Sequence, residues 1–392
     1  ALPIYQDPDK LLEMRLNFYL RGLNKIEDPK AENELVGPNG EIVGRVKNGR
    51  PKFFPDYYVI PMSLDKDNDA QEAFNMIDYF KRNGVLVKEL KEDTGSYKKG
   101  DLVIDMAQAK RGYANHILYK GSNESAWAAM YAELLVNFPD MKGFKAEPVF
   151  KDGLFAGKLG EVTTTRATRT SEIDPKAPYY VIANTSASAV QAVNKAISQG
   201  KSVYLTDDGY IVDRDTFASL LPNYAIYGEA LYKVPNGPTL KPLKIYSPNY
   251  HYNWTGVDAP AHTSLVLEKL GFQIVDTPEE ADVIVLENNR YDASIFGKKP
   301  TLVIGGEAMQ KLEKLGVLSG FDAEKLKGGS DYEGLMKAII DDQDPLTSGY
   351  KKNALFYSNS GNWIEKVPSN FKTLMSIASS DYYIAGWWPK NE

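Results

Sequence analysis

The chain has 392 residues, of which 43% are apolar and 25% are charged, and its formal net charge is -6. These values are typical of a folded soluble protein and exclude global disorder. Without a long Lys/Arg block or a 20-residue apolar span, the sequence predicts no nucleic-acid partner and no membrane span. With no cysteine, it also excludes disulfides, thiolate catalysis and zinc-thiolate sites.

The length predicts two or three domains. The first residue is Ala1, and no initiator methionine precedes it. We therefore expect either a processed protein or a fragment of a longer one. No signal-peptide pattern is present in the sequence.

Residues 1–55 are expected to form an N-terminal helix and a β-ribbon. Asp9 is the predicted N-cap of the helix. Its apolar face has spacings of four, three and four residues and comprises Leu12, Leu16, Tyr19 and Leu23. The ribbon is predicted between residues 35 and 55, where two Asn-Gly pairs at 39–40 and 48–49 are typical of tight hairpin turns.

One stretch of sequence occurs twice, first from Asp56 to Asp105 and again from Tyr179. Each copy predicts an apolar strand that opens Tyr-Tyr-Val-Ile, a helix that stops at a glycine (Gly84 or Gly200), and two further strands. The predicted helix faces are Ala70, Ala73, Phe74, Ile77 and Phe80 in the first copy, and Ala189, Val190, Val193 and Ile197 in the second. We therefore expect two α/β repeat domains, at 56–148 and 149–234.

A linker rich in Pro and Gly at residues 234–238 precedes a change of pattern. Fully apolar strands then alternate with amphipathic helices. The expected strands are 243–247, 272–275, 282–286 and 301–304, and the expected helices are 266–270, 309–315 and 332–340. This alternation favours an open parallel sheet covered on both faces, a doubly wound, flavodoxin-like α/β domain at 240–392.

Several stretches resemble a known family. They are YYVIPMSLDKDNDAQEAFNMIDYFKRNGVLVKEL from Tyr57, YKKGDLVIDMAQAKRGYANHILYKG from Tyr97, WAAMYAELLVNFPDMKGF from Trp127 and AVQAVNKAISQGKSVY from Ala189. They resemble the region that follows the catalytic domain in large secreted M14-type zinc carboxypeptidases of Gram-positive bacteria. The last part of that region is similar to class I glutamine amidotransferase domains. The resemblance implies an extracellular location and an upstream peptidase domain as partner.

The catalytic residues of neither enzyme class can be placed on this chain. A zinc carboxypeptidase needs His-x-x-Glu and a distant His, but none of His116, His251 and His262 begins such a motif. An amidotransferase needs a nucleophilic Cys, and the matching turn at 303–309 carries Glu307 at that position. We therefore expect no catalytic residue, no metal ligand and no cofactor in this chain. Zinc is expected only in the upstream domain.

A pocket is predicted at the carboxyl ends of the parallel strands, where ligands collect in open α/β sheets. Its candidate residues are Glu307, Glu287, Asn288, Asn249 and Trp254. Glu307 could act as a general base. The favoured explanation of Glu307 is structural: Gly305 and Gly306 make a tight strand-to-helix turn, and Glu307 is stabilised by the positive end of the helix.

Two further groups of residues have side chains that could bind a ligand. His251 and His262, with Asp258 between them and Glu268 after, lack a known metal-ligand spacing and are better explained as polar surface. Four tryptophans of the last domain could stack on sugar rings, although such residues are more often core. They are Trp254, Trp363, Trp387 and Trp388.

Three functions are consistent with the sequence. The favoured one is a non-catalytic accessory region of a secreted zinc carboxypeptidase, which acts as a scaffold or binds a peptide or cell-wall substrate. One alternative is a cell-wall glycan or peptidoglycan binding module that uses the late tryptophans. The other is an independent hydrolase with an amidotransferase-like pocket around Glu307 and Glu287.

Overall fold

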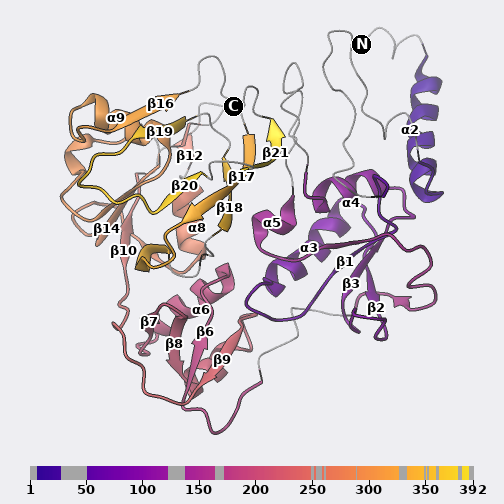
Figure 1. Ribbon diagram of the computed structural model, residues 1–392, viewed down its shortest axis with the longest axis horizontal. Coiled ribbons are helices and arrows are strands. Elements are labelled where there is room, and N and C mark those ends of the chain that lie inside the picture. Colours follow the sequence, from indigo (N-terminus) through magenta and orange to yellow (C-terminus); the bar gives the residue numbers. More distant parts are fainter. Residues whose placement is uncertain are drawn as a thin grey trace.

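The structure is a computed structural model. It describes residues 7–27, 51–121, 137–163, 172–248, 251–252, 258–259, 262–287, 289–325, 333–347, 350, 353–358, 362–377 and 382–387. Within these ranges the chain is a mixed α/β protein with eight α-helices and several sheets, of which one is parallel (Figure 1). None of the helices in these ranges has the length and apolar character that a membrane span requires.

The first sheet is antiparallel and has the strand order β4-β1-β3-β2-β5. Its strands are β1 (Tyr57–Ile60), β2 (Lys88–Leu90), β3 (Leu102–Asp105), β4 (Glu147–Val149) and β5 (Leu159–Gly160). The helices α3 (Ala70–Arg82), α4 (Arg111–Leu118) and α5 (Phe138–Lys142) belong to the same part of the chain. Strands of this sheet thus extend to residue 160, into the range expected for the second repeat.

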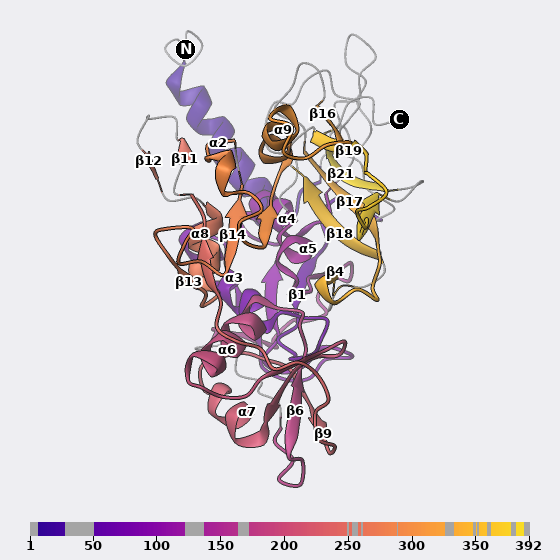
Figure 2. The same cartoon turned by 90° about the vertical axis from the view of Figure 1, so that its left-hand side faces the viewer.

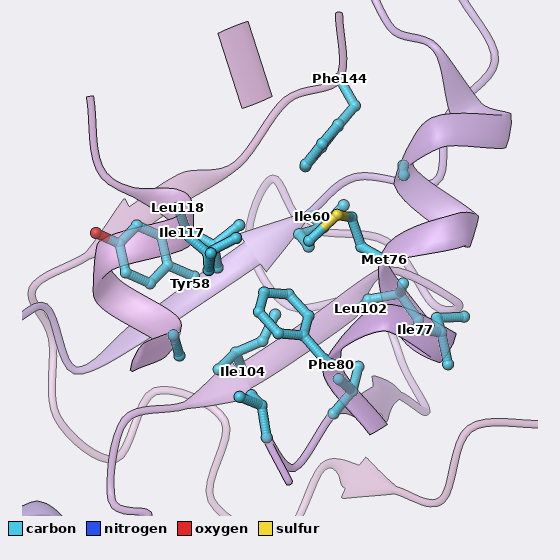
Figure 3. Packing of buried hydrophobic residues seen from close by; sticks show 14 of the residues in the cluster. Tyr58, Ile60, Met76, Ile77, Phe80, Leu102, Ile104, Ile117, Leu118 and Phe144 are labelled. Carbon is cyan, nitrogen blue, oxygen red and sulfur yellow. The ribbon is translucent and has the colours of Figure 1, made fainter. Parts of the chain in front are cut away.

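The core of the first sheet lies between one of its faces and the helices α3 and α4 (Figure 3). Tyr58, Ile60, Leu102 and Ile104 project from alternate positions of β1 and β3, and Phe80 of α3 packs against them with no exposed surface. Burial of a side chain of this size contributes about 1.5–3 kcal/mol. The opposite face is covered by the loop that carries Phe155.

The second antiparallel sheet has the order β7-β8-β6-β9. Its elements are β6 (Tyr179–Ile182), α6 (Ala187–Ser198), β7 (Tyr204–Thr206), β8 (Gly209–Asp213), α7 (Arg214–Leu220) and β9 (Gly228–Leu231). In chain order this repeats the β-α-β-β-α-β arrangement of the first sheet, with the same central pairing. Tyr57 pairs with Asp105 in one sheet, and Tyr179 pairs with Asp213 in the other. The sequence repeat therefore corresponds to two sheets of ferredoxin-like strand order.

Helix α2 (Pro8–Leu23) begins after Asp7, whose side chain accepts the backbone N–H of Lys10 at 3.0 Å. The prediction of Asp9 as N-cap is therefore wrong, because Pro8 occupies the first helical turn and places the cap before it. The predicted apolar face of this helix is largely exposed to solvent. Most of the predicted β-ribbon lies at residues 28–50, outside the described residues.

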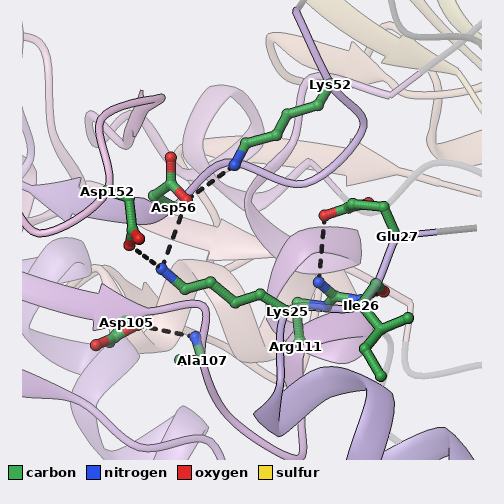
Figure 4. Close-up of polar contacts among 9 residues, drawn as sticks. All are labelled: Lys25, Ile26, Glu27, Lys52, Asp56, Asp105, Ala107, Arg111 and Asp152. Atoms are coloured by element: carbon green, nitrogen blue, oxygen red, sulfur yellow. Dashed lines mark hydrogen bonds and ion pairs between the residues drawn. The ribbon is translucent and has the colours of Figure 1, made fainter.

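The segment that follows α2 is bound to the first sheet by charged side chains (Figure 4). Lys25, in the left-handed region at φ 51°, reaches Asp152 at 2.6 Å and Asp56 at 3.5 Å. Arg111 donates to the carbonyl of Ile26 at 2.6 Å and lies 3.3 Å from Glu27. Burial opposes the positive charge of Lys25, but the hydrogen bond to Asp152 and the nearby carboxylates raise its pKa. These contacts fix where α2 leaves the body of the protein.

The parallel sheet has the order β13-β10-β14-β15 and confirms the parallel strands predicted after residue 240. Its strands are β10 (Lys244–Tyr246), β13 (Gln273–Ile274), β14 (Val283–Leu286) and β15 (Thr301–Val303), and its helices are α8 (His262–Lys269) and α9 (Gly306–Lys314). A short antiparallel pair, β11 (His251–Tyr252) and β12 (Asp258–Ala259), precedes α8. A 3-10 turn spans Ala293–Ile295.

The chain from residue 333 onwards differs from the prediction. The predicted helix at 332–340 is a strand, β17 (Glu333–Ile340). Its partners β18 (Asn353–Ser358), β20 (Met375–Ile377) and β21 (Tyr383–Trp387) are all antiparallel to it. Figure 2 shows β17 with β18 and β21 beside it. Leu335, Met336, Ile339 and Ile340 have helix-like spacing. Pairing with three neighbouring strands outweighs that local preference. The pair β16 (Asp322–Lys325) and β19 (Asn362–Lys366), and a 3-10 turn at Pro345–Thr347, complete this part.

Asp69 is a buried carboxyl group at the N-terminus of α3. It is 6% exposed and accepts the backbone N–H groups of Gln71 and Glu72, each at 3.0 Å. Burial raises its pKa to about 6. The matching N-cap of α6 in the second sheet is Ser186, which carries no charge. The first helix thus has a cap whose charge changes with pH, and the second does not.

We predict that Asp69→Asn changes the pH dependence of stability. A raised pKa in the folded state means that Asp69 favours folding while protonated, and that this contribution is lost as the pH rises through about 4 to 6. Asn caps a helix as well as Asp does but carries no charge. Urea unfolding should therefore show the stability of the variant rising relative to the natural chain between pH 4 and pH 8, by up to about 3 kcal/mol.

Asp78→Asn is the matched control. Asp78 lies on the same helix, but its side chain is 76% exposed and pairs with Arg82 across one turn. Its replacement should shift stability by less than about 0.5 kcal/mol at every pH. If the Asp69→Asn difference were equally flat, the raised pKa of Asp69 would be refuted.

Candidate functional site

The carboxyl ends of three parallel strands, β10, β14 and β15, lie at one edge of the parallel sheet. Ser247 follows β10, Glu287 follows β14, and the turn Gly305–Gly306 follows β15. The strand order changes direction between β10 and β14, the two central strands. In open α/β sheets such a switch point leaves a crevice between the loops, and ligands bind there. This is the edge at which the sequence predicted a pocket.

Glu287 lies at the N-terminus of α8 and is half-buried. Its Oε2 accepts the backbone N–H of Thr263, in the first turn of that helix, at 3.1 Å. A carboxylate is favoured at this end because the helix dipole is positive there and the first N–H groups lack partners within the helix. The contact binds α8 to β14 and gives Glu287 a structural role.

Glu307 lies beside the same edge but at the start of a different helix, α9. It is exposed, in the first turn of α9 after the N-cap Gly305. Gly305 has φ 84°, and a Cβ atom there would lie 3.8 Å from the carbonyl oxygen of Glu287. The N–H of Ile304 also donates to the carbonyl of Leu286 at 2.7 Å. The structure thus brings the turn before Glu307 beside the backbone of Glu287.

The segment after β14 is held by α9. Lys311 donates to the carbonyl oxygens of Asn289, at 2.8 Å, and of Tyr291. Its ammonium group also lies 4.5 Å from the centre of the Tyr291 ring. The hydroxyl of Tyr291 donates to the carbonyl of Ala308 at 2.7 Å, and burial raises its pKa to about 12. These contacts fix the segment after β14 against α9.

Two buried hydroxyl groups at this edge were missed by the sequence analysis. Ser247 is 2% exposed and Ser264, in the first turn of α8, is 5% exposed. Among the residues that the structure describes, the side-chain oxygen of each has no hydrogen-bond partner. A polar residue directly after an apolar strand was the available signal, but an ordinary serine in a loop gives the same pattern.

Several predicted site residues fall outside the described residues. Asn249, Trp254 and Asn288 are in this group, so their place in the pocket stays a prediction. Among the late tryptophans, Trp387 is half-buried at the end of β21, while Trp388 lies outside the described residues. The backbone of Trp363 lies in β19, and its side chain is not among the described parts of the structure.

The histidines give no metal site within the described part of the chain. No group of three or more His, Asp or Glu side chains there is close enough to hold a metal ion. His116 lies in α4, with its ring 6.1 Å from that of Tyr119. His251 and His262 are described only by their backbones, in β11 and at the start of α8.

A cavity of about 840 Å³ lies at the opposite end of the parallel sheet. It is lined by α6 (Val190 and Val193), by the amino ends of the parallel strands (Leu243 and Phe272) and by β18 at Leu355. Cavities of this size can hold a small molecule. Its lining combines these apolar side chains with charged ones, which are Lys66, Asp67, Asp140 and Lys241.

Comparison with known proteins gives no match, because no family model, curated protein or solved structure is significantly similar to the chain. The family resemblance of the sequence motifs stays a prediction.

We predict that Glu287→Ala loosens α8, whereas Glu307→Ala does not. Removal of the side chain that accepts the Thr263 N–H should cost about 1 kcal/mol, the usual value of a lost helix cap. Hydrogen exchange of the α8 amides should therefore be about fivefold faster in Glu287→Ala. The exposed Glu307 makes no such contact, so Glu307→Ala should leave these rates unchanged. Equal rates in both variants would show that Glu287 does not hold α8.

Proposed function

We propose that this chain is a non-catalytic accessory region of a secreted M14-type zinc carboxypeptidase. In this proposal the peptidase domain lies upstream, binds the zinc and hydrolyses the peptide. The two repeats and the parallel sheet form a multidomain, extracellular support that holds a peptide or cell-wall substrate. The sequence resemblance and the absence of a His-x-x-Glu motif support this division of labour.

The order of the parallel strands supports an amidotransferase-like unit within this region. Numbered along the chain from β10, the order β13-β10-β14-β15 is 2-1-3-4, the order of flavodoxin-like sheets. A doubly wound unit of this kind would carry Glu307 near the place of the amidotransferase nucleophile. A carboxylate cannot form the thioester through which glutamine is hydrolysed. We therefore assign this unit a binding role.

The observation that carries the proposal is the docking of the second repeat onto the parallel sheet. Asn194 of α6 donates to the carbonyl of Leu270 at 2.8 Å, and Gln191 donates to the carbonyl of Lys269 at 3.1 Å. Both acceptors lie at the C-terminal end of α8, where carbonyl groups lack partners within the helix. Gly271, at φ 91°, leaves room for the approach, since a Cβ atom there would lie 3.0 Å from that of Asn194. A support needs such fixed contacts between its parts.

We predict that the isolated chain, supplied with zinc, does not hydrolyse peptides with free carboxyl termini. The carboxypeptidase with this region attached should bind its substrate more tightly than the peptidase domain alone, with a lower KM and an unchanged kcat, because the region adds binding contacts but no chemistry. Steady-state kinetics on both forms would measure this difference.

The variant Asn194→Ala tests whether the second repeat must be fixed to the parallel sheet for the region to support substrate binding. Loss of the contact to Leu270 should raise KM towards that of the peptidase domain alone, whereas Ser198→Ala, on the exposed end of the same helix, should not. Turnover by the isolated chain that Glu307→Gln abolishes would instead establish the independent hydrolase.

A further inference from the structure

The cavity of about 840 Å³ beside α6 lies where four parts of the chain meet. Its lining comes from the first repeat, the second repeat, the parallel sheet and the antiparallel sheet of β17, and it includes Lys66, Val193, Phe272 and Leu355. Sites for small molecules have volumes of about 300–1,000 Å³ and occur preferentially where domains meet. The cavity therefore has the size and the position of a ligand site.

Contacts between these parts of the chain hold the walls of the cavity in place. Asn194 donates to the carbonyl of Leu270 at 2.8 Å, and both residues line the cavity. The hydroxyl of Tyr210, also in the lining, donates to the side-chain oxygen of Asn184 at 2.9 Å. Helix α5, which contributes Asp140, contacts β18 (Figure 1). The walls are thus in place before a ligand binds.

Much of the lining is apolar, and part of that apolar surface is exposed to solvent. Leu243, Leu346 and Leu355 are 42%, 83% and 39% exposed, and all three line the cavity together with Val193 and Phe272. Adjoining apolar side chains that stay exposed typically indicate an interaction site. A ligand with an apolar body would cover them.

The charged groups of the lining favour an anion. Lys66 and Lys241 are exposed, and neither has an ion-pair partner among the described residues. Of the two carboxylates, Asp140 accepts the side-chain N–H of Asn137 at 2.9 Å, and Asp67 is not without a partner in the chain. The ammonium groups are therefore the charges that a ligand can neutralise. A carboxylate on an apolar body would satisfy both the lysines and the apolar walls.

We propose that this cavity binds an amphipathic carboxylate, with the apolar body against Val193, Phe272 and Leu355 and the carboxylate paired with Lys66 and Lys241. The carboxylate could belong to a fatty acid or to the C-terminus of a short apolar peptide. The site is independent of the proposed accessory function, since it requires no upstream domain and its test requires no peptidase.

The experiment is titration calorimetry on the full chain with octanoate, octan-1-ol and octyltrimethylammonium, which share one alkyl chain and differ in charge. Octanoate should bind roughly fivefold more tightly than octan-1-ol, because an exposed ion pair strengthens binding by about two- to fivefold, and octyltrimethylammonium should bind most weakly. About 1 M sodium chloride should remove the advantage of octanoate by screening. Hexanoate should bind roughly tenfold more weakly than octanoate, because each buried CH2 group strengthens binding by up to about fourfold.

A second pair of ligands identifies the source of the carboxylate. Octanoate represents a fatty acid, and N-acetyl-leucyl-leucine represents the C-terminus of an apolar peptide with its amine blocked. Tighter binding of octanoate would identify a fatty acid as the ligand, and tighter binding of the blocked dipeptide would identify a peptide terminus.

Variants of exposed residues test the assignment without disturbing the core. Lys66→Ala and Lys241→Ala should each weaken octanoate about two- to fivefold and leave octan-1-ol unchanged, whereas Lys314→Ala, on α9 outside the cavity, should change neither. Leu346→Ala should weaken all three octyl ligands. Its control is Leu86→Ala, which is 62% exposed in the first repeat and does not line the cavity. Thermal melting would verify that each variant is folded.

Three results would overturn the proposal. They are equal binding of octanoate and octyltrimethylammonium, equal binding of octanoate and hexanoate, and no saturable binding of any of these ligands. None of the three would affect the non-catalytic role proposed for the region, which depends on the peptidase comparison above.

Discussion

Helix α8 is held at both ends, and the geometry of the candidate site depends on this. An isolated helix of eight residues does not persist in water, because the cost of forming its first turn is not recovered over so short a length. Leu265 and Val266 are 41% and 54% exposed, so burial of its apolar face contributes only part of its stability. The rest comes from Glu287 at the N-terminal end and from Asn194 and Gln191 at the other. The second repeat therefore helps to position Thr263 and Ser264, although its contacts are at the opposite end of the helix.

The two repeats show how one topology supports different local chemistry. Both bury the second tyrosine of Tyr-Tyr-Val-Ile beneath helices. In the first, the hydroxyl of Tyr58 donates to Asn115 at 2.9 Å, whereas in the second the ring of Tyr180 stacks on Phe217 with centres 4.3 Å apart. The copies share the pairing of this strand with the third strand of the repeat, and both bury its second and fourth residues completely. Polar detail is free to differ, as the caps Asp69 and Ser186 also show.

The sequence predicted the repeats and the parallel strands well, because each rests on a local pattern. Gly84 and Gly200 end their helices in the left-handed conformation, as expected of a stop glycine. The prediction failed at β17, where the apolar spacing fits a helix and only the partners β18, β20 and β21 decide for a strand. Ser247 and Ser264 could not have been found, since burial of a hydroxyl without a partner is a property of packing and has no sequence pattern.

The conformation of the turn after β15 bears on whether Glu307 could act as a nucleophile or base. In hydrolases with a nucleophile on a strand-to-helix elbow, the reactive residue itself occupies the strained position and is thereby directed into the site. Here the left-handed backbone belongs to Gly305, and Glu307 lies two residues later within the regular first turn of α9. Its side chain is exposed, and the strain of the turn does not act on it. The glycine provides the positive φ that the turn from β15 into α9 requires. The turn therefore joins a strand to a helix, as in such hydrolases, but has glycine and no nucleophile at the position of positive φ. This agrees with the binding role proposed for the parallel sheet.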